Sequence, residues 1–261
     1  MILEAIVTTV DEYGCVNLAP MGPTHTVSPC SGSDSSSSTV VSDHQGSDSE
    51  PLASVGADEN SSENGDHKNR VSPSSNAGQE FSKATRETRV PASETHVDGF
   101  ILRPFKTSKT YSNLSVNPFA TIHVTDDSLL FAKSAVAKIS NDEKMSLVHH
   151  LEGTHWWPLR DCHRWFAVEV MQINEDPMRV SMNCRVIRSR EVRPFFGFNR
   201  AKHAVIEAAI LATRTHLLPR EDVMSEIERL LPLVEKTGGP DEHTAFQLLE
   251  TTIQERYAKS Q

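Results

Sequence analysis

The stretch LRPFKTSKTYSNL, residues 102–114, decides how this chain can fold and what it can hold. The apolar residues Phe100 to Leu102 predict the end of a strand. The residues that follow predict a short helix over 109–116, because Pro118 prevents its continuation. Thr107 or Ser108 is a natural N-cap, since a short side-chain oxygen can accept hydrogen bonds from the free amides of the first helical turn.

The charge around this predicted helix start is unusual. A helix N-terminus carries a partial positive charge and favours acidic neighbours, yet Lys106 and Lys109 lie beside it and no acid follows until Asp126. Free amides, hydroxyl groups and cations together suit a phosphate group. An ordinary capped helix with solvated lysines explains the same residues, and both interpretations stay open at this point.

A second motif, VDEYGCVNLAPMG, covers residues 10–22. Alternation in residues 2–10 predicts a strand that is apolar on both faces, and residues 15–19 predict a second strand after a turn. We expect Pro20 to end the pairing because it has no amide to donate. Gly22 would allow the backbone to approach a flat ligand closely. A plain hairpin with a Pro-Gly exit is the simpler alternative.

Taken together, DxxGxxNLAPMG in residues 11–22 and KTSKTYSNL in residues 106–114 resemble the flavin reductase-like FMN-binding split barrels. In that superfamily an Asn-x-Ala-Pro strand end and a Lys-x-Thr-x-x-Asn-Leu helix start form one flavin site. MILE at residues 1–4 and FNRAKHAVIEA at residues 198–208 are similar to an uncharacterised archaeal and bacterial family of this fold, domain of unknown function 447. The resemblance covers residues 1–27 and about 97–216.

The resemblance implies a mainly β fold with added helices (α+β): an FMN-binding split β-barrel of six or seven strands plus a C-terminal α-helical subdomain. It also implies a homodimer with FMN near the interface and a small-molecule electron donor or acceptor. The residues implied to line the flavin ring and its ribityl chain are Asn17, Ala19, Pro20, Met21 and Gly22. Those implied to hold the phosphate are Arg103, Lys106, Thr107, Ser108, Lys109 and Thr110, with Asn113 supporting the turn.

Composition divides the chain. Residues 28–96 are rich in serine, lack periodicity and contain few aromatic residues, so they cannot bury enough apolar area to offset the entropy of ordering. We predict a disordered insertion there. The barrel is then built from residues 1–27 and 97–192, and the helical subdomain from residues 193–261. The net charge of −9 arises mainly in this insertion, so it indicates little about a ligand.

Further elements follow in the downstream part of the chain. The pattern predicts strands over 99–105, 119–124, 165–173 and 179–187. Helices are expected from Ser128, over 141–151 with Met145 facing inward, over 199–216, from Pro219 to Thr237, and from Asp241 to about Ala258. In the helix over 199–216, polar residues at spacings of three, four and seven favour a solvated face over a substrate-facing one.

Two groups of residues between 149 and 163 invite a functional interpretation. The spacing of the histidines and Cys162 matches no usual structural zinc site, so no metal is predicted. Trp156 and Trp157 could cover a flavin ring, or they could be core or interface aromatics. No pair of side chains is placed by the sequence as a catalytic dyad.

The sequence therefore favours an FMN-dependent oxidoreductase of unknown substrate. A non-catalytic FMN-binding or sensing module, and a structural or assembly protein without flavin, are the alternatives. No nucleotide-binding glycine fingerprint or nucleic-acid patch occurs. The absence of a signal peptide, of a membrane-length apolar run and of paired cysteines predicts a cytoplasmic protein that binds neither nucleic acid nor membrane.

Overall fold

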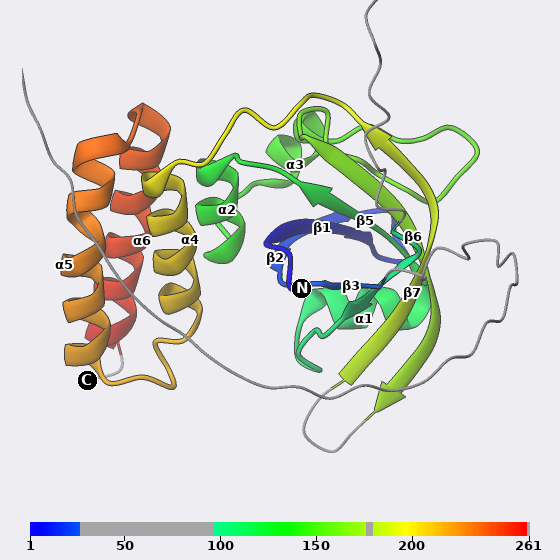
Figure 1. The fold of residues 1–261 in the computed structure, drawn as a ribbon. Coiled ribbons are helices and arrows are strands. Elements are labelled where there is room, and N and C mark those ends of the chain that lie inside the picture. The colour runs from blue at the N-terminus through cyan, green and yellow to red at the C-terminus, as the bar shows by residue number, and fades with distance from the viewer. Residues whose placement is uncertain (27–96, 176–179, 260–261) are drawn as a thin grey trace, which may run out of the picture. The chain divides into compact units, whose positions relative to one another are not determined.

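The computed structural model describes residues 1–26, 97–175 and 180–259. Within these residues the chain forms seven strands and six helices (Figure 1). The strands are β1 Ala5–Val10, β2 Val16–Met21, β3 Thr24–Thr26, β4 Gly99–Leu102, β5 Phe119–Val124, β6 Arg164–Glu175 and β7 Val180–Glu191. The helices are α1 Lys109–Val116, α2 Ser128–Ala135, α3 Asn141–Leu147, α4 Arg200–Thr213, α5 Arg220–Thr237 and α6 Pro240–Lys259.

The strands form one antiparallel sheet in the order β2-β1-β5-β6-β7-β4-β3. Its two outermost strands, β2 and β3, follow each other in the chain. An isolated bridge joins Ile2, just before β1, to Thr24 in β3, and the Leu3 amide donates to the carbonyl of Pro23 at 2.9 Å. These bonds bring the two ends of the curled sheet together next to β1, which leaves β2 as a free edge among the described strands.

Strand β1 is buried along its whole length. Because successive side chains of a strand point to opposite faces, its residues divide between two hydrophobic cores. Ala5 and Val7 belong to the inner cluster, which includes Phe100, Ile122, Phe166 and Met182. Ile6 and Val10 belong to the outer cluster, which includes Leu18, Phe131, Leu159 and Trp165. The sheet is therefore covered on both faces around β1.

A third core, the helical cluster, lies among α2, α4, α5 and α6, which contact one another (Figure 1). Alanines on α4 allow close packing of the helices, and Phe246, Leu249 and Ile253 fill the space from α6. Helix α2 contributes Ala132 and Val136 to this cluster, while its Leu130 and Phe131 pack in the outer cluster. Helix α2 therefore links the C-terminal helices to the sheet.

Asp126, between β5 and α2, connects the C-terminal helices to the sheet through polar contacts. Its carboxylate accepts hydrogen bonds from Arg193 Nη2 and Lys202 Nζ, both at 2.6 Å, and lies 3.1 Å from His163 Nε2. Burial raises the pKa of Asp126, but the hydrogen bonds from Lys202 and Arg193 outweigh it and hold that pKa well below its usual range. The start of α4 is thus tied to the strand ends by a charged group that stays ionised.

The sequence predicted most elements in the described part of the chain. The helix over 109–116 and the strand over 119–124 are confirmed, and of the two expected N-cap candidates, Thr107 and Ser108, the helix uses Ser108. The prediction that Pro20 ends the pairing is wrong, because β2 continues through Pro20, which lies opposite Ile6, to Met21. An edge strand tolerates proline since its missing amide can face away from the neighbouring strand.

Other boundaries shift by a few residues. The strand predicted over 99–105 ends at Leu102, and the helices predicted over 141–151 and 199–216 end at Leu147 and Thr213. Met145, expected to face inward, is 44% exposed. The insertion predicted over 28–96 lies outside the described residues. No helix in the described ranges is long and apolar enough to cross a membrane.

His123 on β5 is a fully buried histidine whose ring nitrogens both have partners. Nε2 accepts from the Leu159 amide at 3.0 Å, so the proton lies on Nδ1, which donates to the Ile6 carbonyl at 2.8 Å. Burial lowers the pKa of His123 to about 4. Between about pH 6.5 and 4, His123 is therefore protonated in the unfolded chain and neutral in the folded chain.

We predict that His123 makes stability fall as the pH falls from about 6.5 to 4. Between these values the unfolded state binds the extra proton, so the free energy of unfolding drops, by about 2 kcal/mol between pH 7.5 and 5.0. His123→Gln should lower stability at pH 7.5 and remove this part of the drop, as measured by urea unfolding at both pH values. His216→Gln is the matched control, because His216 is exposed, and it should keep the drop. An equal drop in His123→Gln and the unmodified chain would contradict the assignment.

Candidate functional site

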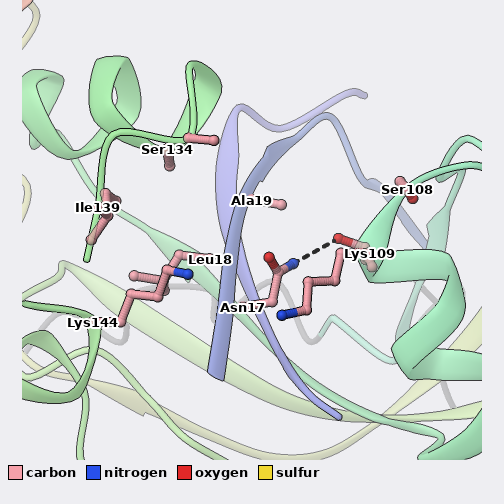
Figure 2. Close-up of a pocket in the computed structure, with 10 residues that line it drawn as sticks. Asn17, Leu18, Ala19, Ser108, Lys109, Ser134, Ile139 and Lys144 are labelled. Atoms are coloured by element: carbon pink, nitrogen blue, oxygen red, sulfur yellow. Dashed lines mark hydrogen bonds between the residues drawn. The ribbon is translucent and has the colours of Figure 1, made fainter. Parts of the chain in front are cut away.

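A cleft of about 180 Å³ lies where β2, α1, α2 and α3 approach one another (Figure 2). Strand β2 contributes the middle of the cleft, the start of α1 forms one side, and the end of α2 with α3 forms the other. The lining residues are Asn17, Leu18, Ala19, Ser108, Lys109, Thr110, Ser134, Ala137, Ile139 and Lys144.

The start of α1 supplies hydrogen-bond donors to this cleft. Ser108 caps the helix, accepting from the Tyr111 amide at 3.2 Å. An amide in a helix donates to the carbonyl four residues before it. For Lys109 and Thr110 these carbonyls lie outside the helix, so both amides have no partner inside α1. The first turn of α1 contains no acid. This end of the cleft therefore presents donors and positive charge, which suit an anion.

Two side-chain hydrogen bonds hold α1 against the sheet. Asn17 Nδ2 donates to Thr110 Oγ1 at 3.2 Å (Figure 2), and Asn113 Nδ2 donates to Thr9 Oγ1 at 3.0 Å. Thr9 and Asn17 lie directly opposite each other in the β1–β2 ladder. Thr110 and Asn113 are both buried. The helix start is thus positioned by one pair of facing residues on the inner face of the sheet.

The cleft lies at the free edge of β2. Asn17 and Ala19 point to one face of the strand and Leu18 to the other, as alternation requires, yet all three line the same cleft. The Asp11 amide donates to the Cys15 carbonyl, so the hydrogen-bonded pairs continue at Thr9–Asn17 and Val7–Ala19. The pair Thr8–Leu18 falls between them. The Leu18 amide and carbonyl therefore point away from β1, toward the cleft.

Five of the twelve residues named from the sequence line the cleft: Asn17, Ala19, Ser108, Lys109 and Thr110. Asn113 holds α1 against the sheet through its bond to Thr9, and its supporting role in a flavin site stays a prediction. The remaining six residues are not among the cleft's lining residues. They are Pro20, Met21, Gly22, Arg103, Lys106 and Thr107.

Several of those six have other neighbours. Arg103 donates to Thr24 at 2.9 Å, and Lys106 pairs with Glu175 at 3.1 Å, next to the bond from the Tyr111 hydroxyl to the same carboxylate. These bonds lower the pKa of Glu175, with Tyr111 the larger cause. Both Lys106 and Glu175 are about half exposed. At Gly22 a Cβ atom would come within 2.9 Å of Ile2, so the close approach there is to the segment just before β1.

Five lining residues were not named from the sequence: Leu18, Ser134, Ala137, Ile139 and Lys144. Four of them belong to α2, α3 and the segment between these helices, far from both motifs in sequence. Ala137 is a non-glycine residue with a positive φ of 57°, where the Lys138 amide closes α2 on the Lys133 carbonyl. Such a conformation is uncommon for a residue with a Cβ, and residues in uncommon conformations cluster at functional sites.

The tryptophans pack rather than line this cleft. Trp156 and Trp157 both lie against the outer cluster, and Trp156 Nε1 donates to the Val168 carbonyl at 3.0 Å. Trp157 stacks on His150 and offers its carbonyl to Thr8 at 2.8 Å. Among the described residues no group of three or more His, Cys, Asp or Glu side chains could hold a metal ion. Cys162 and Cys184 are buried, which raises the pKa of Cys162 to about 11 and of Cys184 to about 12.

Comparison with known families assigns the chain. Two models of one family, each described as a protein of unknown function (DUF447), match it: the N-terminal domain over residues 94–193 and the C-terminal part over residues 199–251. Together they cover more than half of the sequence. The chain belongs to this family. No match is found among curated proteins.

Solved structures agree with this family membership. An FMN-bound DUF447 protein from Methanosarcina mazei superposes with a TM-score of 0.61 at 17% identity, over 96% of this chain and 94% of that chain. The split β-barrel with added helices predicted from the sequence is confirmed. Flavoredoxin from Methanosarcina acetivorans (TM-score 0.40, 9% identity, 74% of each chain) and an FMN-binding protein from Thermus thermophilus (0.39, 11%, 72% and 70%) are weaker matches.

We predict that Asn17 and Thr110 are energetically coupled. Asn17→Ala and Thr110→Val should each lower the free energy of unfolding, and the double variant should lose less than the sum, by about 0.5–1.5 kcal/mol, because both remove one hydrogen bond. Denaturant unfolding of the four proteins measures the coupling. Asn17→Ala combined with Thr252→Val, whose hydroxyl bonds within α6, should be additive within about 0.5 kcal/mol. Additivity in the first cycle as well would show that the bond contributes nothing.

Proposed function

We propose that this chain binds FMN in the cleft at the edge of β2, and that the flavin serves as its redox cofactor toward a small diffusible electron donor or acceptor. The observation that carries the proposal is the arrangement at the start of α1. A capped helix start with free amides and Lys109 is bonded through Thr110 to Asn17 on the edge strand, and all of them line one cleft. The FMN-bound relative with the same fold supports the proposal.

The donor set fits the phosphate of FMN. At neutral pH the phosphate is an anion with several acceptor oxygens, and it would meet the Lys109 ammonium and the first-turn amides of α1. The fit is less direct for Arg103 and Lys106, because these side chains bond to Thr24 at 2.9 Å and to Glu175 at 3.1 Å. Lys109 also has an acidic neighbour, Asp11, but at the longer distance of 3.8 Å. The amide of Leu18, which points away from β1, can donate a hydrogen bond to the edge of a flat ring, and its carbonyl can accept one.

When bound, FMN supplies the hydride and electron chemistry, so the chain needs little acid–base machinery of its own. The chain's residues hold the phosphate at α1, orient the ligand along β2 and limit its contact with water. An oxidoreductase of unknown substrate is the activity that this arrangement supports. The cytoplasmic location expected from the sequence stays part of this proposal.

We further propose that the cleft is completed by a second copy of the chain. Pockets that enclose a ligand of this size usually measure about 300–1,000 Å³, whereas this cleft measures about 180 Å³. A partner placed against the free edge of β2 would enlarge the enclosed volume and exclude water from the ring. This argument favours the homodimer expected from the family resemblance.

Lys109 should distinguish FMN from riboflavin. Because a charge-assisted hydrogen bond contributes about 1.5–3 kcal/mol, Lys109→Gln should weaken FMN binding by about ten- to a hundredfold and leave riboflavin binding unchanged. Flavin-fluorescence titration of the flavin-free protein measures both. Lys138→Gln, an exposed position outside the cleft, makes the same change of charge and should bind FMN normally. Equal affinity of the unmodified protein for FMN and riboflavin would remove the phosphate site.

The dimer is tested separately. We expect light scattering after gel filtration to give the mass of two chains, with one FMN bound per chain. Since the partner completes the cleft, dilution into the monomer range should weaken FMN binding. A monomer that retains full affinity for FMN would contradict the shared site and leave FMN binding itself intact.

A further inference from the structure

The lining of the cleft is positively charged in a chain that is acidic as a whole. Its ten residues include two lysines, Lys109 and Lys144, and, within the described part of the chain, no Asp or Glu. The net charge of the sequence is −9, so an acid-free lining with two cations differs from the average surface. The two lysines enter from opposite sides of β2 (Figure 2). One cation at each side of a cleft concentrates anionic ligands there.

Of the two, Lys144 is the cation that has no counterion within the described part of the chain. The Lys109 ammonium lies 3.8 Å from the Asp11 carboxylate. Lys144 on α3 is half-buried, and its side chain has no hydrogen bond or ion pair with any described residue. The adjacent acid, Glu143, is already paired with Lys133 at 2.7 Å. A lysine side chain that lines a cleft without a partner is stabilised by an anion placed beside its ammonium group.

The position of Lys144 indicates which part of a ligand it would meet. If the phosphate of FMN binds at the start of α1, the remainder of the molecule extends away from α1 along the edge of β2. The far side of the cleft is formed by Leu18, Ile139 and Lys144, as Figure 2 shows. Two of these side chains are apolar and suit a flat ring, and the third carries the charge.

We propose that Lys144 stabilises the negative charge of the reduced flavin ring and so raises the reduction potential of the bound cofactor. This inference rests on the proposed FMN binding. Two electrons and one proton added to the oxidised ring leave it with one negative charge, while the phosphate is unchanged. A cation beside the ring therefore favours the reduced form over the neutral oxidised form. Lys144 acts here as a residue that tunes the cofactor, with no proton transferred to or from it.

The test compares Lys144→Gln with the matched variant Lys138→Gln, which removes a lysine charge nearby in sequence from an exposed position outside the cleft. The affinities for oxidised FMN, and for FMN reduced with dithionite under anaerobic conditions, are measured for the full-length chain. We expect Lys144→Gln to bind oxidised FMN within twofold of the unmodified protein and reduced FMN about tenfold more weakly. Tenfold corresponds to a fall of about 30 mV in the two-electron potential, which a dye-equilibration titration measures independently. Lys138→Gln should change neither quantity.

The outcomes separate this inference from the proposal beneath it. An unmodified protein that binds no FMN overturns the proposed function, and the inference with it. If FMN binds but Lys144→Gln leaves the potential unchanged, only the role of Lys144 is overturned. The same holds if the variant weakens oxidised and reduced FMN equally, because Lys144 would then bind a group whose charge does not change. Equal shifts in Lys144→Gln and Lys138→Gln would assign the effect to overall charge and would also overturn it.

Discussion

The structure depends on β1 having no face open to solvent. All six of its residues are buried, so each face of the strand must be covered by a separate set of side chains. The inner cluster and the outer cluster meet at this strand, and a shift of register by one residue would exchange them. Since β2 pairs with β1 alone, its place at the edge follows from this arrangement. Helix α1 then covers the inner face beside β2, and α2 and α3 cover the outer face.

This arrangement explains why the candidate site combines segments that are distant in sequence. Thr9 and Asn17 lie on the inner face and receive α1 through Asn113 and Thr110. Leu18 lies on the outer face and packs in the outer cluster with Ile139. A ligand at the free edge of β2 touches both faces, so it contacts α1 on one side and Lys144 on the other. The edge strand, rather than either helix, is the element that brings the cleft together.

Two groups of ion pairs, one at Lys106 and one at Asp126, differ in how strongly they stabilise the fold. The pair between Lys106 and Glu175 is about half exposed on both sides, and such pairs contribute only about 0–1 kcal/mol. Lys106 can therefore leave Glu175 for a stronger anion at little cost. Asp126 is different, because it is part-buried and holds Arg193 and Lys202 at 2.6 Å. That group fixes the C-terminal helices to the strand ends, while Lys106 remains adaptable.

Local features of this fold could be predicted from the sequence, and features set by tertiary packing could not. Ser108 and the bounds of α1 follow from capping chemistry and from Pro118, which act within a few residues. Asn17 and Thr110 were named only through a family resemblance that joins two distant motifs. Lys144 gave no local signal, because a lysine on a short polar helix has the pattern of a solvated residue. Met145 was misassigned for a related reason: apolar periodicity in a seven-residue helix is too short to show which face is covered.

Pro20 affects both the pairing of β2 and the cleft beside it. It was expected to end the strand, yet it lies inside β2 at the outer edge of the sheet. An exposed edge invites pairing with another strand, and proteins commonly prevent this with proline because it lacks a donor. Beside Pro20, the Leu18 amide and carbonyl still point outward into the cleft. The edge is therefore protected against a further β-strand, while the polar backbone groups of Leu18 remain available to a flat ligand.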